Sequence, residues 1–98
     1  MNDRELLELA AKAAGFNIDF ADYRDLGSHT VYRKRDEYLT WWNPLADDGD
    51  ALRLAVKLDL LTDLRTYSYE PDEWRIDPYA ATRRAIVRAA AEIGRMTR

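Results

Sequence analysis

The stretch at residues 41–58 reads WWNPLADDGDALRLAVKL and contains the start signal of one helix together with its apolar face. Three acidic residues stand immediately before the apolar run, around a single glycine: Asp47, Asp48 and Asp50. Side chains of this type cap a helix by accepting hydrogen bonds from its free N–H groups, and their charge favours the positive end of the helix dipole. We therefore expect a helix to begin at these aspartates.

The helix that follows is apolar around most of its circumference. Its polar residues form only a narrow stripe of Asp50, Arg53 and Lys57. A helix of this kind is either buried on nearly all sides or has one side that meets a partner. Both alternatives remain open, and the partner in the second includes another copy of the chain, as in a homodimer.

A second helix start lies at residues 77–86, which read DPYAATRRAI. Asp77 is suited to the cap and Pro78 to the first helical position, because that position needs no N–H donor. We expect this helix to run to about residue 93. Its inward face is expected to consist of Tyr79, Ile86, Ala90 and Ile93.

The remaining elements follow from local periodicity and stop signals. An N-terminal helix is expected over residues 4–14, because Asn2 or Asp3 can cap it and Gly15 can end it. Alternation of apolar and polar residues, with turn residues between the runs, predicts five strands over residues 16–23, 30–33, 38–42, 64–69 and 74–76.

The adjacent tryptophans, Trp41 and Trp42, bear on how these elements are layered. Consecutive strand residues point to opposite faces, so both are buried only if both faces of the sheet are covered. The sequence therefore predicts an α/β fold in a single domain over residues 1–98: a three-layer helix/sheet/helix sandwich in the order α-β-β-β-α-β-β-α.

The composition of the chain excludes several classes of function. The chain has 98 residues and a formal net charge of −3, which argues against non-specific DNA binding because that depends on neutralising phosphates. It has no cysteine, which excludes disulfides, thiolate metal sites and thiol catalysis. No apolar run approaches the roughly 18 residues that a membrane span needs, and we expect a cytoplasmic protein.

No set of residues forms a convincing catalytic or metal site. The aspartates around Gly49 resemble part of a calcium loop, but Pro44 falls where such a loop would begin, so we interpret them as caps. Asp25, Ser28 and His29 suggest a hydrolytic triad, but triad members normally come from separate elements and these crowd one turn. We expect no enzyme activity, no cofactor and no metal.

Basic and aromatic side chains supply candidates for a binding surface. Four arginines give the last helix a basic outer face: Arg83, Arg84, Arg88 and Arg95. Trp, Tyr and Arg dominate protein-binding hot spots, and Lys and Arg beside aromatics also suit nucleic acid. The candidate partner-binding residues are Arg33, Lys34, Arg35, Tyr67, Tyr69, Trp74, Arg84 and Arg88.

Three segments resemble the phage ABA-sandwich domain family, a group of small proteins encoded by bacteriophages and prophages. They are WNPLADDGDALRLAV at residues 42–56, DPYAATRRAIVRAAAEIG at residues 77–94 and ELLELAAKAAG at residues 5–15. The resemblance covers roughly half the chain by motif spacing and leaves out residues 22–37. It implies a sheet between helical layers and a phage origin, with no assigned biochemistry.

From these observations we expect a non-enzymatic, phage-encoded protein that binds a host or phage protein in the bacterial cytoplasm. Interference with a host system such as a CRISPR complex is a special case that rests on analogy alone. The alternative is an accessory protein that binds nucleic acid through its arginine and lysine patches, and a steep loss of affinity with salt would distinguish it.

Overall fold

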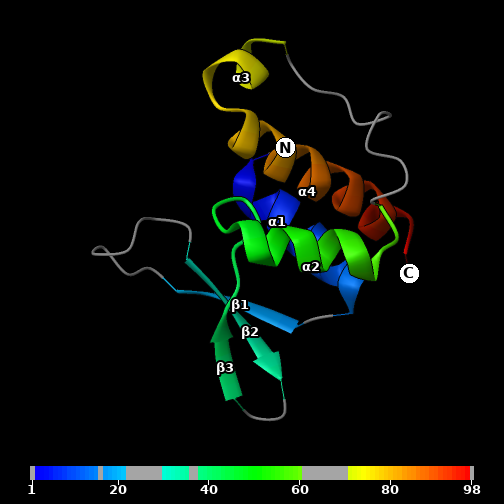
Figure 1. Ribbon diagram of the computed structural model, residues 1–98. Coiled ribbons are helices and arrows are strands. Elements are labelled where there is room, and N and C mark those ends of the chain that lie inside the picture. The colour runs from blue at the N-terminus through cyan, green and yellow to red at the C-terminus, as the bar shows by residue number, and fades with distance from the viewer. Residues whose placement is uncertain (1, 16, 22–29, 36–37, 61–70, 98) are drawn as a thin grey trace.

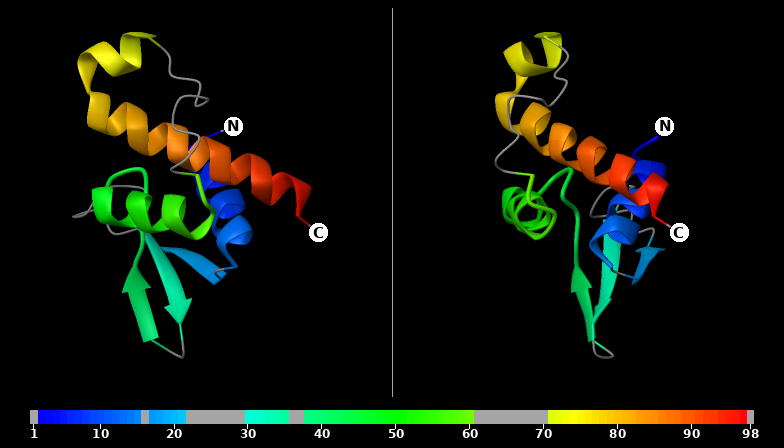
Figure 2. Two further views of the ribbon diagram at one scale, coloured as in Figure 1. Left: turned by 45° about the vertical axis from the view of Figure 1, so that its right-hand side comes forward. Right: turned by 90° about the vertical axis from the view of Figure 1, so that its right-hand side faces the viewer.

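The computed structural model describes residues 2–15, 17–21, 30–35, 38–60 and 71–97, and this part of the chain is mostly helical. Its helices are α1 (Asp3–Ala14), α2 (Asp48–Lys57), α3 (Pro71–Ile76) and α4 (Pro78–Met96). α1 and α2 both pack against α4, the longest of them, and α3 contacts it as well (Figure 1). A small sheet lies to one side of this helical body (Figure 2).

The starts of α1 and α2 are where the sequence places them. Asn2 Oδ1 accepts a hydrogen bond from the Glu5 N–H at 2.8 Å, and Gly15 ends α1 with a φ of 79°. Asp47 Oδ2 accepts from the Asp50 N–H, also at 2.8 Å. Both caps use a side-chain oxygen three residues before the N–H that it binds, which is the usual geometry of a helix N-cap.

The start of α4 is also confirmed, but its end differs. Asp77 Oδ1 accepts hydrogen bonds from the N–H groups of Tyr79 and Ala80 at 3.0 and 3.1 Å. Pro78, which follows Asp77 directly, occupies the first helical position. The helix continues to Met96, so Gly94 lies inside it. Gly94 is buried against the backbone of Leu9 in α1, where there is no room for a Cβ.

The sheet has three antiparallel strands in the order β1-β2-β3. These are β1 (Asn17–Ala21), β2 (Thr30–Arg35) and β3 (Tyr38–Trp41), and they coincide with the first three strands expected from the sequence. Phe20 is in register with Val31, and Arg33 is in register with Thr40. Ile18 of β1 is half-buried and packs against the helical core.

The predicted three-layer sandwich is wrong. The part of the chain that the structure describes is mostly helical, and its core cluster contains residues of α1, α2 and α4 together with Trp42. β3 ends at Trp41, so Trp42 lies in the segment that leaves the sheet and is buried in that cluster. The two tryptophans are therefore not successive strand residues, and the argument for helices on both faces of a sheet fails. The α/β description and the ABA-sandwich architecture implied by the family resemblance are wrong for the same reason.

The strand expected over residues 74–76 is also wrong, because these residues are the last turn of α3. Pro71 occupies the first position of that helix, where a proline is tolerated, and Asp72 and Glu73 follow it. The strand expected over residues 64–69 lies outside the described residues.

Candidate functional site

The outer face of α2 exposes large apolar side chains. Ala51, Leu54 and Ala55 of this helix are buried in the core, whereas Leu52 and Val56 are 52% and 59% exposed. Residues four positions apart lie above one another on the same side of a helix. Leu52 and Val56 therefore form a continuous apolar ridge. The alternative that α2 is buried on nearly all sides is wrong, and the alternative that one side meets a partner stays a prediction.

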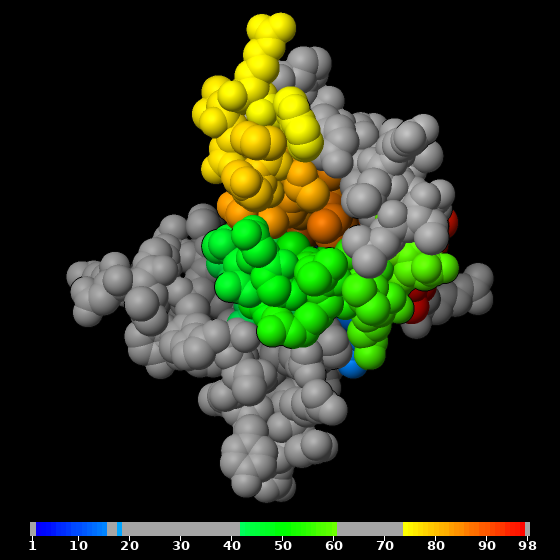
Figure 3. Space-filling view, in the orientation of Figure 1, coloured from blue at the N-terminus to red at the C-terminus, as the bar shows by residue number. Residues whose placement is uncertain are grey.

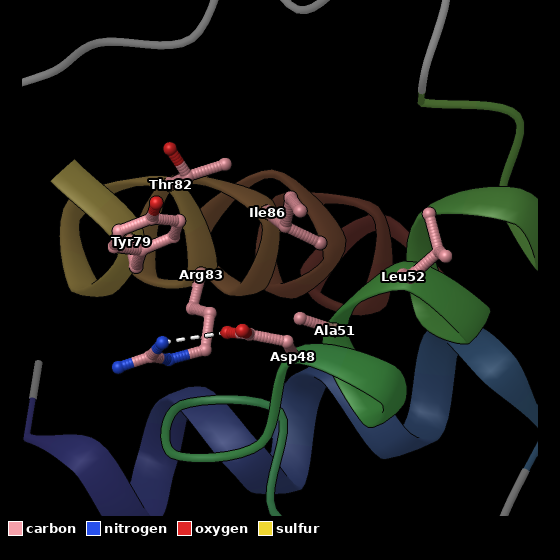
Figure 4. Close-up of a pocket in the computed structure, with 7 residues that line it drawn as sticks. All are labelled: Asp48, Ala51, Leu52, Tyr79, Thr82, Arg83 and Ile86. Carbon is pink, nitrogen blue, oxygen red and sulfur yellow. Dashed lines mark hydrogen bonds and ion pairs between the residues drawn. The ribbon is translucent and has the colours of Figure 1, made fainter.

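The first turn of α4 continues this apolar surface. Tyr79, which was expected to face inward, is 71% exposed, although Ile86 and Ala90 are buried as expected. Seven residues make nearly two full turns, so Tyr79 and Ile86 lie on the same side of α4. The prediction fails because Tyr79 lies near the start of α4, beyond the part that α2 covers (Figure 4).

A pocket of about 250 Å³ lies between α2 and α4. Figure 3 shows the hollow between the two helices, with residues of α4 at its floor. The surface exposed inside the pocket is almost entirely apolar, because the polar residues contribute mainly their apolar atoms. The residues that line it are Asp48, Ala51, Leu52, Tyr79, Thr82, Arg83 and Ile86. Ala51 and Ile86 are buried and Leu52 and Tyr79 are exposed, so the exposed apolar side chains surround a hollow with an apolar floor.

One ion pair marks the end of the pocket nearest the start of α2. Arg83 Nη1 donates to Asp48 Oδ1 at 2.7 Å, and Arg83 Nε donates to the carbonyl oxygen of Leu45 at 2.9 Å (Figure 4). The Arg83 side chain is only 17% exposed, whereas that of Asp48 is 73% exposed. The arginine therefore faces the protein, and the carboxylate is the charge that solvent meets.

The acidic residues at the start of α2 have protein partners. Asp47 caps the helix and Asp48 pairs with Arg83. Asp50 accepts a hydrogen bond from the Asn43 N–H at 2.9 Å and another from Arg53 Nη1 at 3.2 Å. Asp47 is therefore a capping residue, as interpreted from the sequence, whereas the contacts of Asp48 and Asp50 are of other kinds. Within the described part of the chain, no three His, Cys, Asp or Glu residues are grouped so that they could hold a metal ion.

The structure does not bring the sequence-predicted binding residues together. The backbone of Arg33, Lys34 and Arg35 lies in β2, at the opposite end of the molecule from α3, which carries Trp74 (Figures 1 and 2). Trp74 is 48% exposed, and its role in binding stays a prediction. Arg88 is half-buried in α4. Tyr67 and Tyr69, and the triad residues Asp25, Ser28 and His29, lie outside the described residues.

The basic outer face of α4 is largely neutralised by ion pairs. Arg84 Nη1 lies 2.9 Å from Asp3 Oδ1 of α1, and Arg95 Nη1 lies 3.0 Å from Glu92 Oε1 within α4. With Arg83 paired to Asp48, these three arginines contact acidic groups of the same chain. Such pairing suits a structural role better than phosphate binding.

Sequence reasoning did not identify Leu52, Val56 and Tyr79 as candidate site residues. The sequence did contain a signal for Leu52 and Val56, because α2 is apolar around most of its circumference. When only one side of such a helix packs against the core, some of its apolar residues remain exposed. No comparable signal existed for Tyr79, since it lies on the same side of α4 as the buried Ile86 and is exposed because α2 does not extend over the start of α4.

Among the described helices, none combines the length and the apolar composition needed to cross a membrane. Comparisons with models of protein families, with curated proteins and with solved structures found no significant match.

Proposed function

We propose that this protein is a non-enzymatic module that binds another protein through Leu52, Val56 and Tyr79, which together we call the docking surface. The observation that supports the proposal is the exposure of these three large apolar side chains, two of which, Leu52 and Tyr79, border a pocket with an apolar floor. Exposed apolar patches beside a hollow are typical of protein interaction sites. Tyrosine is also enriched among residues that dominate binding energy.

The charges favour a protein partner over nucleic acid. The net charge is −3, and Arg83, Arg84 and Arg95 of α4 are paired with carboxylates of the chain itself. Binding of nucleic acid by Arg33, Lys34 and Arg35 is the alternative. It predicts an affinity for oligonucleotides that falls steeply as salt rises, whereas an apolar interface tolerates salt.

We place the partner in the bacterial cytoplasm and propose a phage or prophage origin. This part of the proposal rests on the segments at residues 42–56 and 77–94, whose likeness to phage proteins is one of sequence pattern alone. Inhibition of a host system such as a CRISPR complex remains a special case by analogy.

The test is an affinity capture from a bacterial lysate at moderate and at high salt, with mass spectrometry of the retained proteins. Three chains are compared: the natural protein, Val56→Ser and Met96→Ser. Val56 belongs to the docking surface, and Met96 is an exposed apolar side chain at the far end of α4, so it serves as a matched control. Circular dichroism verifies that both variants are folded.

We expect a protein retained in stoichiometric amount at high salt by the natural chain and by Met96→Ser, and lost with Val56→Ser. Equal retention by all three chains would reject the docking surface. Recovery of nucleic acid alone, lost as salt rises, would establish the alternative.

A further inference from the structure

The pocket between α2 and α4 has the size of a site for a side chain. Sites for small molecules typically enclose about 300–1,000 Å³. The pocket here encloses about 250 Å³ and is open to solvent, with Leu52 and Tyr79 at its rim and Ile86 at its floor (Figure 4). An apolar hollow of this size fits one large aliphatic or aromatic side chain better than a metabolite or cofactor.

Two charged residues line this hollow, Asp48 and Arg83; they are paired with each other, and the carboxylate is the more exposed of the two. Arg83 is held inward by Asp48 and by the carbonyl oxygen of Leu45, which uses two of its donor groups. The Asp48 carboxylate remains mostly exposed to solvent, and the neighbouring Asp47 is also exposed. A partner that enters the pocket therefore meets a carboxylate edge, and the overall net charge of −3 attracts the same kind of partner. A partner that complements this surface therefore carries a basic group next to the apolar side chain that enters the pocket.

The spacing of these groups indicates the form of the partner. Asp48 and Leu52 are four residues apart on α2, which corresponds to about 6 Å along the helix axis. A partner helix lying along the groove presents side chains at the same spacing, one turn apart. Grooves between two helices commonly receive the apolar face of an amphipathic helix.

We infer that the pocket between α2 and α4 anchors a basic amphipathic helix of the partner protein. One large apolar side chain of that helix fills the pocket, and a lysine or arginine one turn away pairs with Asp48. The inference rests on the proposed function and deepens it, because it assigns the anchor point and the chemistry of the partner.

The probe is a helical peptide composed of leucine and lysine, with the two residue types one turn apart. The matched peptide has the same sequence with glutamate in place of lysine. Both are titrated into the ¹⁵N-labelled protein, and the backbone amide signals are followed by NMR. We expect the lysine peptide to shift the signals of Leu52, Thr82 and Ile86, and the glutamate peptide to leave them in place.

Two variants test the charge contact. Asp48→Asn removes the carboxylate at the pocket, and Asp59→Asn makes the same change at the other end of α2, outside the pocket. The loss of one exposed ion pair lowers the affinity of a complex about two- to five-fold. We expect that loss with Asp48→Asn and none with Asp59→Asn.

A third variant tests the apolar contact. Leu52→Ser removes an exposed wall of the pocket, and Met96→Ser is its control elsewhere on the surface. We expect Leu52→Ser to weaken binding of the lysine peptide about ten-fold or more, in line with the loss of one buried aliphatic contact. Met96→Ser should bind like the natural protein.

Several outcomes would overturn the inference. These are equal binding of the two peptides, equal effects of Asp48→Asn and Asp59→Asn, or amide shifts that avoid the pocket. A concentration-dependent dimer that Leu52→Ser dissociates would also overturn it, because the occupant would then be a second copy of the chain. A lysate partner that requires Val56 but not Asp48 would reject the basic anchor and leave the proposed function intact.

Discussion

The contacts of α4 with α1 and with α2 differ in how completely they are closed. In the α1–α4 contact, the buried Gly94 of α4 lies directly against the backbone of Leu9 in α1. On the other side, Ala51, Leu54 and Ala55 of α2 are buried, while Leu52 and Val56 of the same helix remain outside. Small residues let helix backbones approach closely and close the interface to solvent, whereas the larger residues beside α2 border an open pocket.

This difference separates stability from binding. The α1–α4 contact has no space left for a ligand, since even a Cβ at Gly94 would collide with the backbone of Leu9. The α2–α4 contact leaves apolar surface that the chain does not cover. We therefore expect substitutions on the first side to change the free energy of unfolding, and substitutions on the second to change binding.

The largest effect is expected from truncating a core leucine. Leu7 of α1 is fully buried, so Leu7→Ala should lower the free energy of unfolding by about 2–5 kcal/mol through lost burial and a cavity. The same change at the exposed Leu52 should cost less than about 0.5 kcal/mol. Urea unfolding followed by circular dichroism measures both, and similar losses would contradict the comparison.

The next effect concerns the close approach of α1 and α4. Gly94→Ala should destabilise the fold by about 1–3 kcal/mol, because the new Cβ overlaps the Leu9 carbonyl group and the backbones must separate. This outweighs the gain of about 1 kcal/mol that alanine normally brings to a helix. Thermal unfolding is the measurement.

Gly49→Ala is the matched control. A Cβ there would meet side-chain atoms and no backbone: the end of the flexible Arg53 side chain, at 3.0 Å from Nη1, and Asp47 Oδ2, at 3.2 Å. We expect unchanged or slightly raised stability. If Gly94→Ala were equally harmless, the α1–α4 contact would be looser than described.

A smaller effect is expected at the cap of α4. Asp77→Ala leaves the N–H groups of Tyr79 and Ala80 without their side-chain acceptor and should lower stability by about 1 kcal/mol. Asparagine caps helices as well as aspartate, so Asp77→Asn should retain most of the stability. A loss with Asp77→Asn as large as with Asp77→Ala would mean that the carboxylate charge matters more than the cap hydrogen bond.

The smallest effect is expected from the ion pair between α1 and α4. Asp3 and Arg84 are each about one-third exposed, and pairs of this kind contribute about 0.2–1 kcal/mol. A double-mutant cycle with Asp3→Asn and Arg84→Gln at low and at high salt measures the coupling. A coupling that exceeds the loss from Leu7→Ala would show that charge, not packing, holds α1 against α4.

Local chemistry explains which elements were predictable. Asn2, Asp47 and Asp77 were identified as helix starts because each accepts hydrogen bonds from N–H groups two or three residues away. Residues 74–76 were assigned to the wrong element, because a proline before acidic residues suits a turn and a helix start equally. In the candidate site, Asp47 was interpreted correctly as a cap, but Asp48 and Asp50 make other contacts and the exposed apolar residues were missed.

The sequence by itself determined where α1, α2 and α4 begin, because a helix start depends on neighbours along the chain. It also excluded disulfides, thiolate metal sites and thiol catalysis, because the chain has no cysteine. Only the tertiary structure decided that α1 packs directly on α4 and that Trp42 belongs to a helical core. It also decided that Leu52, Val56 and Tyr79 remain outside. The physical reason is that burial depends on where distant helices end and on how closely their backbones approach, and neither quantity is encoded in a local pattern.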